Sequence, residues 1–131
     1  MNTIDVLIVV DVEGALASND LQDNVYLIDT NKYVGSGNEG QAELKTVCQD
    51  TQPISWSVVP VSPANDVDIV QFTGRMVNDK ICVPKQYTMP GGTYWQGVVE
   101  AQGMTGEQQY SVVLTMDGRQ MSFDPFLEIG S

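Results

Sequence analysis

Carboxylates are the only abundant side chains in this sequence that could do acid, base or metal chemistry. The 131 residues include seventeen Asp and Glu and no histidine. Without histidine there is no Ser-His or Cys-His dyad, and the commonest zinc ligand is missing. Hydrolysis of a glycosidic bond would need two carboxyl groups roughly 5 to 10 Å apart, one with a raised pKa. No pair is marked out for that role, so we predict a protein that is not an enzyme, with no catalytic residue, metal or cofactor.

Some carboxylates follow predicted strands and could take part in a ligand site. Asp11, Glu13 and Asp124 are the acidic candidates. An exposed aromatic residue, Tyr94 or Trp95, would supply the ring that stacks on a sugar. Carboxylate oxygens also suit calcium, but the spaced Asp pattern of an EF-hand is absent. We expect Asp11, Glu13 and Asp124 to lie on separate solvated surfaces rather than in one site.

The charge balance limits the partners of the chain. Seventeen acidic and six scattered basic residues give a net charge of −11, and such a field repels nucleic acid and anionic membranes. We interpret the acidity as a device for solubility, with cation binding as the alternative. The first residues lack the basic segment of a secretory signal, and the apolar run 6–10 is too short to span a bilayer. A cytoplasmic protein is expected, with Cys48 and Cys82 as buried thiols, and with a disulfide or a reactive thiol as the alternatives.

Alternating apolar residues predict short strands along the chain. The first run, from Ile4 to Val12, is apolar on both sides at its middle, which is typical of a central strand. Residues 13–20 are too short for a stable helix and are interpreted as a connection with at most one helical turn. Further strands are expected at 25–28, 54–59, 66–73, 81–83, 93–101 and 110–116. The spacing favours an all-β fold, an antiparallel β-sandwich of about eight or nine short strands, as a single domain over residues 1–131.

Turn signals place the ends of several strands. Asp117-Gly118 is a pair favoured in two-residue type I′ turns, so a hairpin is predicted around it. A change of apolar side between Ile69 and Val70 suggests a β-bulge. The residue before a proline is held extended, so Asp124-Pro125 predicts a bend ahead of the last strand.

Blocks of residues spread over nearly the whole chain carry a family resemblance. They are, in order, 4–11 (IDVLIVVD), 25–28 (VYLI), 36–40 (SGNEG), 54–56 (ISW) and 123–127 (FDPFL). Together they resemble the PixA/AidA family of bacterial inclusion-body proteins. The resemblance implies that Trp56 is a core residue and that a structural motif at a strand bend is formed by Phe123, Asp124, Pro125 and Phe126. Asp124 would accept nearby backbone N–H groups there.

Two hypotheses for function follow. The first, implied by the resemblance, is a bacterial storage or assembly protein of the cytoplasm, with inclusions as its setting, that acts by self-association as a homodimer or larger oligomer. The alternative is a β-sandwich module that binds a carbohydrate or a cation, by analogy with other sandwich folds. Neither nucleic acid nor a membrane is expected as a partner.

Overall fold

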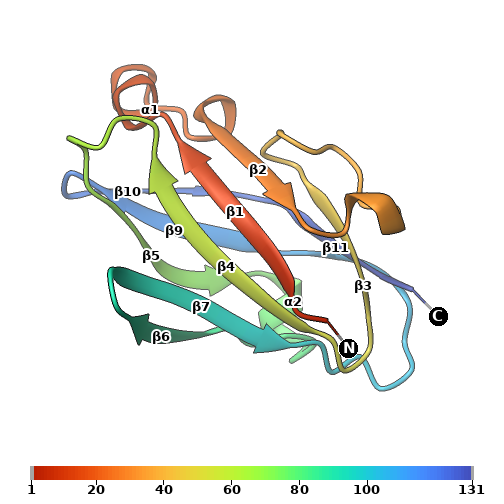
Figure 1. Ribbon diagram of the computed structural model, residues 1–131. Helices are drawn as coiled ribbons and strands as arrows, with labels where there is room; N and C mark the ends of the chain where they lie inside the picture. The colour runs from red at the N-terminus through yellow and green to blue at the C-terminus, as the bar shows by residue number, and fades with distance from the viewer. Residues whose placement is uncertain (1, 131) are drawn as a thin grey trace.

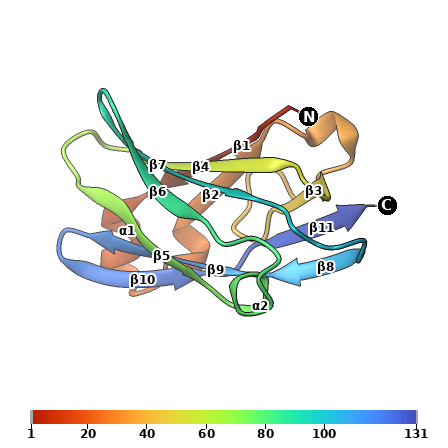
Figure 2. The same ribbon diagram turned by 90° about the horizontal axis from the view of Figure 1, so that it is seen from below.

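The computed structural model describes residues 2–130, which form mainly β-strands in two facing layers (Figure 1, Figure 2). One layer is a five-stranded sheet of order β2-β1-β4-β7-β6. Its strands are β1 Ile4–Val10, β2 Val25–Asp29, β4 Pro53–Pro60, β6 Lys85–Met89 and β7 Gly92–Val98. The other layer holds two three-stranded sheets, of order β10-β9-β5 and β3-β11-β8. Their strands are β3 Lys45–Gln49, β5 Val67–Thr73, β8 Gly106–Gln109, β9 Ser111–Met116, β10 Arg119–Phe123 and β11 Phe126–Gly130. The expected β-rich, sandwich-like architecture is confirmed.

The central position predicted for the first strand is also confirmed. β1 lies between β2 and β4. Its inward side chains are fully buried between the layers, while Leu7 and Val9 on the outward face are half-buried. The buried inward residues are Ile4, Val6, Ile8 and Val10. A strand with two neighbours and apolar residues on both faces therefore organises the larger sheet.

The expectation of a purely antiparallel sandwich is wrong. β1 pairs in parallel with β4, and β3 pairs in parallel with β11. A parallel pair needs a long crossover connection, and the chain between β1 and β4 contains a helix, β2 and β3. Local alternation gives the strands but not their partners, so these pairings are not visible in the sequence pattern.

The strand count is higher than expected. Eleven strands lie within residues 2–130, against the predicted eight or nine, a number that rests on a spacing of about 8 to 15 residues from one strand to the next. β6 and β8 consist mostly of exposed, polar residues, so hydrophobic alternation does not mark them. Residues 81–83, expected as a strand, belong to none. Ile81 and Cys82 are nevertheless buried, in the link that leads into β6.

Two short helices correct the expectation of at most one helical turn. They are α1 Val12–Ser18 and α2 Arg75–Asn78, beside the 3-10 turns η1 Gln22–Asn24 and η2 Lys32–Val34. α1 buries Val12 and Ala15, and this packing supplies what a seven-residue helix lacks in isolation. No helix within residues 2–130 is long and apolar enough to cross a membrane.

The predicted turn and bulge are confirmed. Asp117 and Gly118 both have positive φ angles, 48° and 87°, between the paired strands β9 and β10. The register between β5 and β9 shifts between Ile69 and Gln71, where the bulge is expected. Asp124-Pro125 carries the chain from β10 in one small sheet to β11 in the other.

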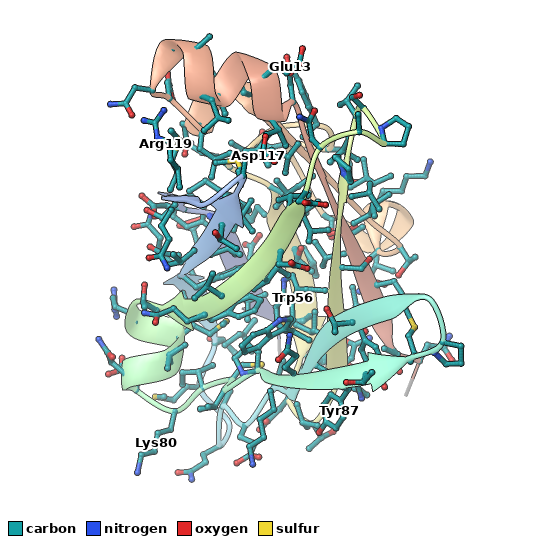
Figure 3. All side chains as sticks on the ribbon, turned by 90° about the vertical axis from the view of Figure 1, so that its left-hand side faces the viewer. Glu13, Trp56, Lys80, Tyr87, Asp117 and Arg119 are labelled. Carbon is teal, nitrogen blue, oxygen red and sulfur yellow. The ribbon has the colours of Figure 1, made fainter. Side chains whose placement is uncertain are left out.

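Trp56 occupies the centre of the core, as predicted. Its side chain is fully buried between the two layers (Figure 3). The indole N–H donates a hydrogen bond to the hydroxyl of Tyr110 at 3.2 Å, and the Phe72 ring lies 4.9 Å away between centroids. Trp56 thus joins β4 of one layer to β5 and the β8–β9 link of the other.

Candidate functional site

The three carboxylates proposed as ligands lie in different local settings. Asp11 caps α1 by accepting a hydrogen bond from the Gly14 N–H at 3.0 Å, and Glu13 is exposed in the first turn of that helix. Asp124 is exposed and accepts a hydrogen bond from the Ser111 hydroxyl at 2.6 Å. The contact found in the described chain is thus with a side chain, whereas backbone N–H donors are expected from the sequence. Each of these contacts is accounted for by a cap or a strand link.

Asp124 lies far from Asp11 and Glu13. One end of β10 lies beside α1, because Arg119 at the start of this strand donates a hydrogen bond to the Leu16 carbonyl at 3.3 Å. Figure 3 shows Arg119 beside α1. Asp124 follows the other end of β10. At about 3.3 Å per residue, β10 separates the two ends by roughly 15 Å. Among residues 2–130, no three Asp, Glu, His or Cys side chains gather closely enough to hold a metal ion.

Other acidic residues also bind backbone groups. Asp50, which no motif in the sequence marks, accepts hydrogen bonds from the N–H groups of Ala101 and Gly103 at 2.8 and 3.1 Å. These bonds lower the pKa of the Asp50 carboxyl group. An acidic side chain can therefore stabilise a loop in this protein as well as contribute negative charge.

The two aromatic candidates on β7 point to opposite faces of the sheet. Trp95 faces inward and packs against Phe72 at 5.5 Å between ring centroids, and its indole N–H is buried without a partner in the described chain. Tyr94 faces outward and stacks on Tyr87 of β6, with centroids 5.5 Å apart and planes 20° apart. Only Tyr94 is thus placed to meet a ligand from solvent.

A hollow of about 580 Å³ lies beside Tyr94 on the outer face of the larger sheet. We refer to it as the Tyr94 hollow. It is lined by Thr3, Asp5, Ser55, Ser57, Met89, Tyr94 and Gln96. Ser55 and Ser57 are the outward residues at the middle of β4, and Gln96 is paired with Ser55 across the strands.

A second hollow, of about 590 Å³, lies on the other side of the Tyr87–Tyr94 pair, near the link from α2 to β6. Lys80 and Lys85 line it together with Tyr87 and Val98, and Glu100 also reaches it. Neither lysine takes part in an ion pair within the described residues. Figure 3 shows Lys80 and Tyr87 at this end of the molecule.

Exposed and half-buried apolar side chains adjoin the Tyr94 hollow on the same outer face, where Leu7 is opposite Ser57 of the hollow. We call these residues, Leu7, Val9, Tyr26, Ile28 and Val59, the apolar face. Tyr26, Ile28 and Val59 are 45%, 47% and 41% exposed. Pairing brings the residues into adjacent rows, because Val9 is opposite both Tyr26 and Val59, and Leu7 is opposite Ile28.

A partly buried carboxyl pair lies at the end of β2. Asp29 accepts a hydrogen bond from the Thr46 hydroxyl at 2.8 Å, and its backbone N–H donates to Glu39 Oε1 at 2.9 Å. Burial raises the pKa of Glu39, and the neighbouring Asp29 carboxyl group raises it further. The other oxygen, Glu39 Oε2, is buried without a hydrogen-bond partner in the described chain. Neither residue of this pair lines the two hollows described above.

Replacing Glu39 with Gln should stabilise the protein at neutral pH. A raised carboxyl pKa means that the folded state favours the protonated form, so this stabilisation is present below the ordinary pKa and is lost as pH rises through the raised one. Gln keeps the acceptor for the Asp29 N–H and carries no charge. Because Glu39 is partly exposed and solvent screens its charge, we expect a gain of at most about 1 kcal/mol at pH 7, shrinking toward pH 4, in urea unfolding. Glu43→Gln, an exposed carboxylate nearby, controls for the lower net charge; an equal gain in that variant would contradict the prediction.

Cys48 and Cys82 are buried free thiols, as expected. Burial raises the pKa of each thiol to about 12. Since the thiolate is the reactive form, neither cysteine provides a nucleophile at neutral pH.

Several residues of these surfaces are not identified from the sequence. Tyr87, Ser55 and Gln96 join Tyr94 only through strand pairing, which no local pattern reveals. Tyr26 and Ile28 could have been identified from the sequence, because residues 25–28 are all apolar and therefore place apolar side chains on both faces of the strand. In the structure, this strand, β2, lies at the edge of its sheet.

Comparison with known proteins gives the fold relatives of the chain. The crystal structure of an inclusion body protein (PixA) from Burkholderia cenocepacia J2315 matches with a TM-score of 0.74, covering 98% of this chain and 96% of that one, at 11% sequence identity. The PixA/AidA resemblance is therefore confirmed in its implied fold. No curated protein matches the sequence. A family model described as a domain of unknown function, DUF8788, matches residues 2–122, and the chain belongs to that family.

Proposed function

We propose that this protein is a non-catalytic assembly protein whose folded domains self-associate through the apolar face. The single observation that carries the proposal is the cluster of exposed apolar side chains on the outer face of β1, β2 and β4. Large exposed apolar patches on soluble proteins commonly mark interaction sites. The fold likeness to an inclusion body protein supports the same class of function.

Charge restricts where a second copy of the chain can dock, and the apolar face is the surface where it opposes docking least. Two chains that each carry a net charge of −11 repel one another over most of their surfaces. The outward residues of β1, β2 and β4, all of which the structure describes, include one charged side chain, Asp5. Face-to-face contact of two apolar faces therefore brings the copies together where repulsion is least, in a two-fold dimer.

The edges of the larger sheet are less suited to this contact. Beside β2, the Gly40 N–H already donates to the Leu27 carbonyl. At the other edge, Pro84 and Pro90 flank β6, and Lys85 begins it; prolines and lysines at an edge oppose strand addition. Association through the face rather than the edge is therefore the proposed mode, and storage in cytoplasmic inclusions is its proposed setting.

Replacing Ile28 with Glu should break the dimer. The change introduces a charge opposite Leu7 on the apolar face, and burying it against a second acidic chain is costly. Sedimentation equilibrium from micromolar to millimolar protein is expected to give twice the 14.3 kDa chain mass for wild type. We expect the dissociation constant of the Ile28→Glu dimer to be about tenfold or more higher than that of wild type.

Met104→Glu is the matched control, because Met104 is 55% exposed in a loop away from the apolar face. It makes the same charge change and should leave the dimer intact. Higher salt should tighten wild-type association by screening the repulsion between the acidic chains. A wild-type monomer at all concentrations, or equal weakening in both variants, would overturn the proposal.

A further inference from the structure

We propose that the Tyr94 hollow binds a neutral saccharide without a metal ion. The proposal goes beyond self-association and concerns the part of the outer sheet face that adjoins the apolar face. It begins with the aromatic wall of the hollow. Tyr87 of β6 covers one face of the Tyr94 ring. Since β7 lies between β6 and β4, the other face of Tyr94 is directed toward β4, on the side where the hollow lies.

The floor of the hollow carries hydrogen-bonding groups that the protein does not use. The Ser55 and Ser57 hydroxyls and the Gln96 amide all line it. None of these side chains has a hydrogen bond to another residue in the described part of the chain. Hydroxyl and amide groups both donate and accept, so they suit a ligand rich in hydroxyl groups.

A carboxylate completes the polar lining. Asp5 is opposite Ser55 in the parallel pairing of β1 with β4, and it is the one carboxylate that lines the hollow in the described chain. An ionised carboxylate is an acceptor only, so Asp5 would accept from a hydroxyl of the ligand. A single carboxylate falls short of the several oxygen ligands that calcium needs.

Saccharide chemistry matches this combination better than other ligand classes. The C–H face of a pyranose ring can pack on the free face of Tyr94 while its hydroxyl groups reach Ser55, Ser57 and Gln96. A wholly apolar ligand would bury these polar groups without partners, which is costly. An anion would be repelled by Asp5 and by the net charge of −11. The volume of about 580 Å³ falls within the usual range of small-molecule sites, about 300 to 1,000 Å³.

The test is titration of the intact chain, in EDTA, with neutral oligosaccharides of glucose, galactose, mannose and N-acetylglucosamine. Binding is followed by calorimetry and by backbone amide NMR shifts. We expect at least one series to bind, with shifts centred on β4 and β7. Tyr94→Ala removes the aromatic ring of the hollow, and Ser57→Val replaces a hydroxyl group with methyl groups. Each variant should weaken binding about tenfold or more. Tyr94→Phe, which keeps the ring, should retain binding.

Met104→Ala and Ser122→Val are matched controls, since both residues are exposed and lie outside the hollow. They should bind as wild type does. Far-UV circular dichroism shows whether each variant is folded, and the Ser57 variant decides the outcome if Tyr94→Ala does not fold. No binding by wild type, binding that EDTA abolishes, or equal losses in the controls would overturn the proposal. Oligomer mass is a separate measurement, so failure here leaves the self-association proposal to its own test.

Discussion

Replacing Trp56 with Ala should destabilise the protein by about 3 to 5 kcal/mol, the range found when a buried Trp or Phe is truncated. Trp56 is fully buried and contacts Phe72 and Tyr110 from the facing layer. Its loss removes a large apolar area and leaves a cavity between the layers. The Tyr110 hydroxyl also loses its donor. Because a domain of this size is stable by only about 5 to 15 kcal/mol, urea unfolding should show a large fall in the midpoint.

Tyr110→Phe separates the hydrogen bond from the packing. The variant keeps the ring but leaves the buried Trp56 indole N–H without an acceptor, which should cost about 1 to 3 kcal/mol. Tyr26→Phe, which removes an exposed hydroxyl group, should change the free energy of unfolding little. A Trp56→Ala variant as stable as wild type would show that the two layers do not depend on this contact.

The predictable parts of the fold are those that short-range pattern determines. The apolar alternation of β1 identifies a central strand, and Asp117-Gly118 identifies the β9–β10 hairpin because few other pairs accept two positive φ angles. The bulge near Ile69 follows from a reversal of apolar side within a single strand. In each case the signal and the structure lie within a few residues of one another.

The parts that could not be predicted depend on contacts between distant segments. The parallel pairing of β1 with β4 is decided by how the intervening chain crosses over, and β3 pairs with β11 from the other end of the sequence. α1 forms because Val12 and Ala15 are buried, and the Arg119 side chain from β10 reaches its Leu16 carbonyl. A seven-residue segment shows neither contact in its own sequence.

The candidate site illustrates the same limit. Tyr94 and Trp95 are adjacent in sequence, so either could be the exposed aromatic residue until the facing of β7 is known. The structure turns Trp95 toward Phe72 and Tyr94 toward Tyr87. The Ser55 and Ser57 floor becomes part of a hollow only because β4 pairs beside β7. Exposed aromatic residues can therefore be proposed from sequence, but the polar groups around them cannot.

Replacing Gly74 with Ala should destabilise the protein by about 3 kcal/mol, through backbone strain and a clash that add together. Gly74 has φ +98° and ψ −171° ahead of α2, a conformation that suits glycine almost alone. An added Cβ would lie 3.0 Å from the Tyr110 Cα and 3.3 Å from the Gln109 carbonyl oxygen. Both neighbours are backbone atoms, so no side chain can rotate away to make room.

Gly118→Ala isolates the conformational cost from the clash. Gly118 also has a positive φ, +87°, but an added Cβ would meet nothing within 4 Å, so its loss should be about 1 to 2 kcal/mol. The two variants should also differ in tryptophan fluorescence. Gly74→Ala pushes on the main chain of Tyr110, whose hydroxyl group accepts from Trp56, whereas Gly118 lies in the distant β9–β10 turn. Equal unfolding free energies and unchanged fluorescence in both variants would mean that the contact of Gly74 with Tyr110 does not hold the aromatic core in place.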